Sequence, residues 1–314
     1  WAQRLGLIQG SFVEDREFEY ITKSEFQNVL NEAVLLYQET YSAYYQDSEA
    51  GRLLYLSIKK LLNHCNCISI LLDGTSFEAV ENSNQVDHAS AKVLLRSALE
   101  IYITLVSLFW FEGKEKLGEQ EFRFLVYKYS SLKSRQKLDH ENITNYRLRE
   151  KISNEKSEIK KLEKMIEYKG LELGKEQVHI KNIIKKGWQA KPIKSRLEET
   201  TLPNHFKMQY SYLCGYSHSG FDSYMQLAID ESSEWNKKTS KEIIYFLVSF
   251  LLGKLNQALV FNLPEKLEIK TDLTETYRLL KKYYTSGLWW ALKNEGLVLK
   301  PFLHPLPIRC FIGI

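Results

Sequence analysis

The chain has 314 residues, which is enough for one large domain or two ordinary ones. Its 44% of hydrophobic and 26% of charged residues are typical of a soluble globular protein, and four cysteines in this length exclude a disulfide scaffold. The net charge of +4 is too small to indicate a polyanion partner by itself. We therefore expect a cytoplasmic protein, and because the sequence begins at Trp1 we expect a trimmed or incomplete reading frame.

Few helix-breaking residues interrupt the chain, which holds only six prolines and 15 glycines. Ser24 and Gln27 have the spacing of a capping box, and apolar residues then recur at helical spacing. The same pattern returns further on and stops at Asp73-Gly74, a typical helix end. The N-terminal part of the body, residues 1–132, is therefore predicted to contain helices at 24–46, 51–73, 87–111 and 119–132.

Residues 133–199 differ in composition from the rest of the chain. They hold 18 Lys or Arg and 11 Asp or Glu, so this segment carries a net charge of +7. Ile152, Ile159 and Ile166 lie seven positions apart and form a short heptad-like seam, which two glycines separate from a returning segment. We predict a charged helical hairpin arm over 133–199, with few contacts between residues 140–187 and the body.

The chain is predicted to return to the body over residues 200–299. Its most apolar stretch, 243–253, is short for a bilayer span, so we expect a buried helix over about 239–261 and no membrane partner. An aromatic-rich helix is expected over 272–294 and an irregular, proline-containing tail over 300–314. No segment alternates with the period of a strand. The predicted fold is all-α: a multi-helix bundle with an inserted charged helical hairpin.

Arg96 and Glu100 form the first part of a candidate site, because they share one helix face in very apolar surroundings. The plainer interpretation is that these two residues lie on the solvent-exposed face of an amphipathic helix. Arg before Glu is the weaker order for an isolated helical ion pair, which favours a third partner instead.

The second part of this site is His218, which lies between two serines and among tyrosines. Such a histidine is either a satisfied core or capping residue or a general acid–base group. We predict a catalytic cluster of Arg96, Glu100, His218 and Ser219, in which Arg96, Glu100 and His218 meet in space.

Arg135 and His140 are an alternative catalytic pair. Their Arg-x4-His spacing matches the pattern of HEPN ribonucleases, in which an Arg and a His act near a scissile phosphate. In a chain with seven histidines, about 0.7 such spacings arise by chance, so the pair alone carries little weight.

The stretch from residue 180 to 196 contains six basic residues and no acid. Lys181, Lys185 and Lys186 are predicted to bind nucleic-acid phosphates, with Trp188 as a stacking aromatic. The alternative is a solvated basic stretch without a ligand.

A metal site is considered at His64, Cys65 and Cys67. The spacing is wrong for a zinc knuckle, no second pair completes it, and Cys65 fits an apolar helix stripe. No metal and no cofactor are predicted.

Three short motifs together carry a resemblance to a known family. They are Arg96-x3-Glu100 in an apolar helix, Phe122-Arg123-Phe124 with Arg135-Gln136-Lys137, and Tyr212 with Ser217-His218-Ser219. With them the chain resembles, over about residues 50–230, a bacterial family known as domain-of-unknown-function family 5677. The resemblance implies an all-helical fold and a polar cluster of Arg96, Glu100 and His218, and it supplies no reaction. Similar helical proteins occur in bacterial defence loci, which favours an RNA-directed activity.

Two functions remain open. One is a metal-independent, RNA-directed nuclease or toxin-like protein of a defence system, and the other is a non-catalytic helical interaction or scaffold protein. The partners considered are RNA or a protein bound through the basic arm, and a second copy of the chain. Convergence of the predicted cluster in an open cleft favours the enzyme, whereas burial with mutual satisfaction favours the interaction protein.

Overall fold

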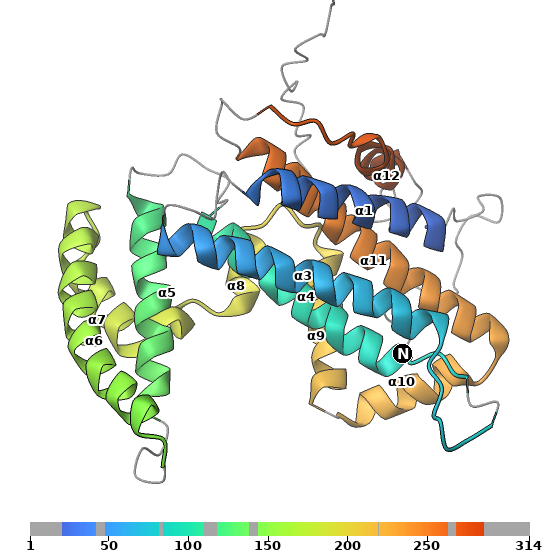
Figure 1. Cartoon of the computed structure of the whole chain (residues 1–314), viewed down its shortest axis with the longest axis horizontal. Coiled ribbons are helices and arrows are strands. Elements are labelled where there is room, and N and C mark those ends of the chain that lie inside the picture. Colours follow the sequence, from blue (N-terminus) through green and yellow to red (C-terminus); the bar gives the residue numbers. More distant parts are fainter. Residues whose placement is uncertain are drawn as a thin grey trace, which may run out of the picture.

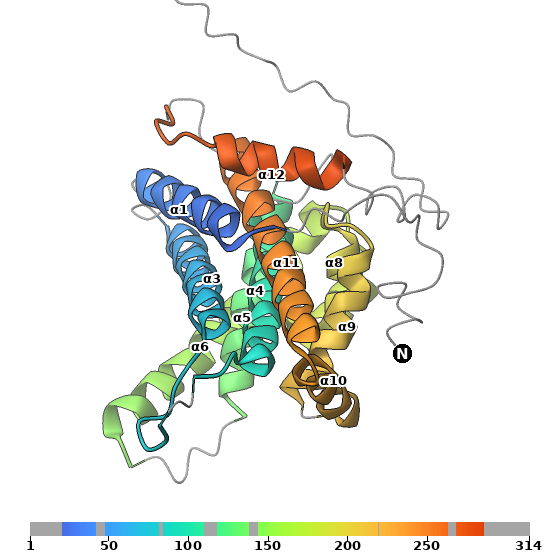
Figure 2. The ribbon, with the colours of Figure 1, turned by 90° about the vertical axis from the view of Figure 1, so that its right-hand side faces the viewer.

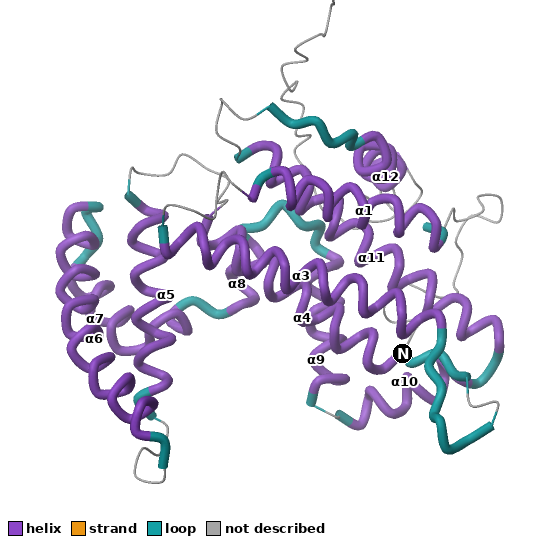
Figure 3. The backbone as a smooth tube through the Cα atoms, in the orientation of Figure 1, coloured by secondary structure: helices purple, strands orange, loops and turns teal. Residues whose placement is uncertain are grey.

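The computed structural model describes residues 21–41, 48–81, 84–109, 118–137, 144–218, 220–262 and 268–285. Within these ranges every regular element beyond one isolated bridge is helical, so the predicted all-α fold is confirmed (Figure 1 and Figure 3). The helices are α1 (Lys23–Glu39), α3 (Glu49–Asp73), α4 (His88–Phe109), α5 (Glu119–Arg135), α6 (Tyr146–Glu172), α7 (Gln177–Lys186), the 3-10 turn η1 (Gly187–Ala190), α8 (Ile193–Glu198), α9 (His205–Ser217), α10 (Phe221–Glu231), α11 (Glu234–Phe261) and α12 (Thr274–Thr285).

The ends of two helices differ from the prediction for local reasons. The capping box of α1 is formed by Thr22 and Glu25, whose side chains each accept a hydrogen bond from the other's backbone N–H, rather than by the predicted pair two residues later. α11 begins five residues before the predicted start because the Ser233 hydroxyl caps it. Residues 42–46, 286–294 and 300–314 of the predicted elements lie outside the described residues.

The body of the protein is built around α11, which packs against α1, α4, α10 and α12 (Figure 2). Val248, Phe250 and Leu251 are fully buried at its centre. Among the described helices α11 is the one that is long and apolar enough to cross a bilayer, and 72% of its most apolar window is buried inside the protein. α3 and α4 pack side by side against the rest of this core.

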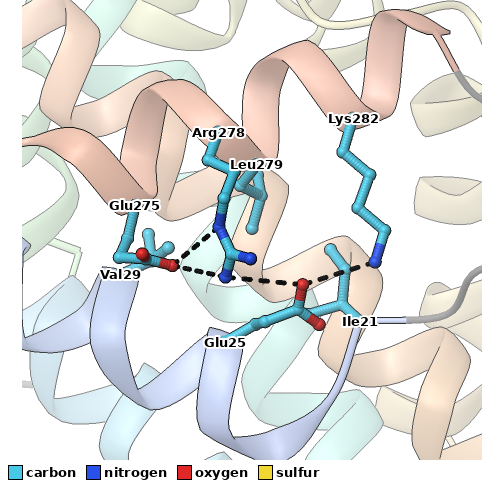
Figure 4. Close-up of a pocket in the computed structure, with 7 residues that line it drawn as sticks. All are labelled: Ile21, Glu25, Val29, Glu275, Arg278, Leu279 and Lys282. Atoms are coloured by element: carbon cyan, nitrogen blue, oxygen red, sulfur yellow. Dashed lines mark hydrogen bonds and ion pairs between the residues drawn. The ribbon is translucent and has the colours of Figure 1, made fainter.

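Carboxylates of α1 attach α12 to the body. Glu32 accepts hydrogen bonds from the backbone N–H groups of Glu275 and Thr276, at 2.8 Å each, and so satisfies the first turn of α12. Figure 4 shows a second contact, in which Glu25 lies between Arg278 and Lys282. The small pocket beside it has a volume of about 10 Å³, so this seam joins two helices and has no room for a substrate.

A second hydrophobic core lies outside the body, among α5, α6 and α7, which we call the α5–α7 unit. Leu162, Ile166 and Ile180 are buried in it. α6 and α7 approach closely at Gly170, where an added Cβ would lie 2.7 Å from Cδ1 of Ile180. Tyr129 of α5 is fully buried in the same core and donates a hydrogen bond to Glu163.

The α5–α7 unit includes a helix that the sequence analysis placed in the body. α5 contributes Phe122, Tyr129 and Leu132 to the second core, while Lys128 forms an ion pair with Glu49 of α3. Figure 1 shows α6 and α7 on the side of α5 that faces away from the body. The predicted domain division at residue 133 stays a prediction.

Candidate functional site

The polar stripe along α4 is turned towards other helices rather than towards solvent. His88, Lys92, Arg96 and Glu100 lie four residues apart, and His88 and Lys92 are only 2% and 5% exposed. Tyr210 of α9 donates a hydrogen bond to Glu100, and Lys92 donates one to Tyr216 of α9. α4 and α9 therefore run antiparallel, and we call the contact between them the α4–α9 seam. A solvated helix face therefore does not describe His88 and Lys92, whereas Arg96 and Glu100 are intermediate in exposure.

Lys92 is the centre of a buried polar cluster. Its ammonium donates to the Tyr212 hydroxyl at 3.0 Å, to the Tyr216 hydroxyl at 2.9 Å and to Oδ2 of Asp230 at 2.5 Å. All three N–H groups are thus used, which is what a buried ammonium requires. Burial lowers the pKa of Lys92, against the opposing charge of Asp230, and burial raises the pKa of both tyrosines.

Asp230 brings α10 into this cluster. Its second carboxylate oxygen accepts a hydrogen bond from Nε2 of Gln226 at 3.0 Å, one turn earlier on α10. Both Lys92 and Asp230 have side chains only 6% exposed. The cluster therefore joins α4, α9 and α10 through a satisfied ion pair, and this arrangement favours a structural role over acid–base catalysis.

His88 lies one turn before Lys92 and is a second buried titratable group of the stripe. Neither ring nitrogen has a hydrogen-bond partner among the described residues. Burial lowers the pKa of His88, supported by the charges of Lys92 and Lys241 and opposed by Asp230 and Asp87. Below about pH 6.5, His88 is therefore protonated in the unfolded chain, whereas in the folded protein it stays neutral until the pH falls below its lowered pKa.

We expect wild type to lose stability relative to His88→Leu as the pH falls from about 7 to 5. The relative loss is up to about 1.4 kcal/mol per pH unit until the folded pKa is passed. Urea unfolding of both proteins across this range measures the difference. Curves that stay parallel throughout would contradict the assignment to His88.

Arg96 and Glu100 form the ion pair that the sequence suggested, and a third partner is present. Nη2 of Arg96 lies 2.8 Å from Oε1 of Glu100, and the Tyr210 hydroxyl donates to the same oxygen at 2.8 Å. The Arg96 guanidinium also lies over the Tyr210 ring, at 5.7 Å from its centroid. The two side chains are 20% and 34% exposed, so they lie at the edge of the seam, and Nε of Arg96 is buried there without a hydrogen-bond partner.

His218 is not part of this group. It is the exposed residue that ends α9, and its backbone N–H bonds to the carbonyl of Cys214. Eight residues separate it from Tyr210, which is about 12 Å along a helix. Tyr210 is the α9 residue that contacts Glu100, so the predicted convergence with His218 does not occur there. Ser219 lies outside the described residues, and the catalytic roles stay predictions.

Of the alternative pair, Arg135 is engaged within the α5–α7 unit. Its Nη1 lies 3.1 Å from Oε1 of Glu155, a carboxylate that is 7% exposed. His140 lies outside the described residues. A buried glutamate needs such a counter-ion, so this contact gives Arg135 a structural role that is independent of any phosphate.

The predicted basic stretch divides into exposed lysines and a packed tryptophan. Lys181, Lys185 and Lys186 are exposed on α7. Trp188 is half-buried, because its ring meets Tyr127 edge to face and lies under the guanidinium of Arg196 at 4.6 Å. The lysines are therefore free to meet phosphates, whereas much of the tryptophan surface already has partners.

A groove of about 390 Å³ opens beside the seam, between α8, α9 and α10. Lys194, Lys207 and Asp222 supply charges of both signs to its walls, and Lys207 lies 3.6 Å from Glu198. No three His, Cys, Asp or Glu side chains gather as metal ligands within the described parts of the chain. The groove has room for a small molecule.

Sequence reasoning missed the residues that satisfy this seam, Tyr210, Tyr212, Tyr216 and Asp230. A usable signal was present in the sequence, because Lys92 lies one helical turn before Arg96 on the same apolar helix and a buried ammonium requires an acid. The tyrosines at positions 212 and 216 also share one face of α9, at the spacing of one turn.

Comparison with known proteins gives one match. A family model described as "Family of unknown function (DUF5677)" matches residues 52–236, more than half of the chain. Neither the curated proteins nor the solved structures contain a match. The matched region runs from α3 to the start of α11 and so includes the α4–α9 seam and the α5–α7 unit.

Proposed function

The chain belongs to the DUF5677 family, and we propose that it is a non-catalytic RNA-binding protein whose helices α6 and α7 hold single-stranded RNA. The main observation behind this proposal is the positive charge on the exposed surface of these two helices. Among the described residues, the following ten cations are exposed and have no acid within ion-pair distance: Arg147, Arg149, Lys151, Lys156, Lys160, Lys161, Lys164, Lys181, Lys185 and Lys186.

The acids of α6 neutralise this surface only in part. Glu155 and Glu158 are paired with cations of α5, Glu172 is paired with Lys169, and Glu163 accepts a hydrogen bond from Tyr129. Glu150 and Glu167 are exposed on α6, so two further exposed acids stand against the ten exposed cations and an excess of positive charge remains. Such a surface attracts a phosphate backbone through release of its counterions.

An exposed aromatic side chain favours a single strand over a duplex. Tyr168 is 73% exposed, and Lys161, Lys164 and Tyr168 share one face of α6 because they are three and seven residues apart. This face is opposite Leu162 and Ile166, which are buried in the second core. Unstacked bases can stack on such a ring while lysines contact the flanking phosphates.

The nuclease alternative needs Arg96, Glu100 and His218 around one phosphate. Arg96 and Glu100 already form an ion pair with each other, and Glu100 also accepts a hydrogen bond from Tyr210. His218 lies about two turns further along α9 than Tyr210. This geometry supports binding better than cleavage.

The test is binding of a labelled single-stranded RNA of about 20 nucleotides. Lys185→Ala with Lys186→Ala is expected to weaken binding about 25-fold at 0.1 M salt, because two lost phosphate contacts lower the log–log salt slope by about 1.4. Tyr168→Ala should cost about 1–3 kcal/mol of binding free energy and leave the slope unchanged, since stacking releases no counterions.

The matched control is Lys59→Ala with Lys60→Ala, an adjacent lysine pair that is likewise exposed, on α3 of the body. Its affinity for the same RNA should equal that of wild type. Equal losses in both double variants would mean that binding follows total charge alone, and the assignment to α6 and α7 would be withdrawn.

A further inference from the structure

α10 is an amphipathic helix whose polar face is turned inward. Ser223 and Asp230 are buried, and Asp230 and Gln226 join the cluster around Lys92. A surface helix normally buries its apolar stripe instead. Here the apolar residues have the spacing i, i+3, i+4, i+7 and i+8 on the outer face, and they are Phe221, Tyr224, Met225, Ala228 and Ile229.

The outer face of α10 is strongly exposed. Phe221 is 77% exposed, Tyr224 60%, Met225 53% and Ile229 43%. Trp235, 61% exposed, follows at the first turn of α11, where Asn236 bonds to the Ile229 carbonyl and fixes the corner. Figure 1 and Figure 2 place α10 at the edge of the body, beyond the end of α9. We call these five residues, together with Ala228, the α10 face.

The charges around the α10 face indicate what kind of partner fits it. Asp222 and Glu231 are exposed on its two flanks, and Glu234, which is paired with Lys237, follows. A helix that lies on a membrane carries Lys and Arg along its border, and a nucleic acid would be repelled by these acids. The chemistry therefore fits the apolar surface of a protein.

The area of the α10 face fits a second copy of the chain. With about 150–250 Å² for a large aromatic side chain, the five large residues expose roughly 600 Å² at the fractions given above. Two such faces would together bury about 1,200 Å², which reaches the lower end of stable specific interfaces.

We propose that the protein is a homodimer in which the α10 faces of two copies pack against each other about a two-fold axis. In a two-fold interface the same patch serves both subunits, so one continuous apolar stripe is sufficient. Ala228 lies near the middle of the stripe, where a small side chain lets the two helix axes approach closely. This dimer uses no residue of α6 or α7, so it stands independently of the RNA proposal.

The test is the mass of the full chain in solution, measured by sedimentation equilibrium at about 100 μM, which lies above the micromolar Kd of a small interface. Wild type should have about twice the monomer mass of 36.9 kDa. Met225→Glu places a charge in the centre of the stripe and should give the monomer mass, and Ala228→Arg should do the same.

The matched control is Met165→Glu, because Met165 is a similarly exposed methionine, 46%, on α6. It should remain a dimer, and circular dichroism should show unchanged helix content in all variants. A monomeric wild type would overturn the proposal, as would a dimeric Met225→Glu or a monomeric Met165→Glu.

Discussion

Replacing Asp230 by Ala is expected to lower the free energy of unfolding by about 3–5 kcal/mol. The substitution leaves the Lys92 ammonium buried, with only the two tyrosine hydroxyls as partners. Removing one member of a buried ion pair is costly because the remaining charge keeps its desolvation penalty. Equilibrium urea unfolding at pH 7 measures the change.

The control for this prediction removes both charges at once. Lys92→Met with Asp230→Leu keeps a similar volume and leaves no unpaired charge, so it should stay within about 1–2 kcal/mol of wild type. If Asp230→Ala costs less than about 1 kcal/mol, or if the double variant is the less stable one, the cluster does not hold α10 on the body in the way inferred here.

Ile166→Ala is expected to lower the stability of the α5–α7 unit by about 2–5 kcal/mol, since it removes a fully buried side chain from the second core. The matched variant is Ile68→Ala, which removes an equally buried isoleucine from the body. Because the two cores have no residue in common among the described residues, we expect each variant to act mainly on its own core.

Amide hydrogen exchange followed by mass spectrometry separates the two effects. Ile166→Ala should reduce protection in α6 and α7 and leave α11 protected, and Ile68→Ala should reduce protection in α3 and α11. Equal losses of protection in both regions from either variant would show that the two cores unfold as one cooperative unit. That result would leave α6 and α7 as part of the body.

Local periodicity carried most of the prediction of the fold. Helical spacing and end signals located α3 and α4 to within two residues and α11 to within five, because apolar recurrence and capping depend on neighbours in sequence. The packing partner of α5 was not predictable in this way, since its apolar stripe would fit either core equally well.

The candidate site shows where local reasoning ends. The Arg96–Glu100 pair lies within one helix and could be predicted, whereas its contact with Tyr210 depends on how α9 crosses α4. The orientation of α10 was equally hidden, because an amphipathic pattern looks the same whichever face is buried. Asp230 decides that orientation through Lys92, 138 positions away in the chain.

The salt dependence of RNA binding tests the central claim most directly. Single-stranded RNA should bind wild type less tightly as salt rises, with a log–log slope of about −4 if about six of the exposed cations of α6 and α7 contact phosphates. A titration from about 0.05 to 0.5 M salt measures this slope. An absent or salt-independent interaction at the low end of that range would contradict the account and remove RNA as the partner of these two helices.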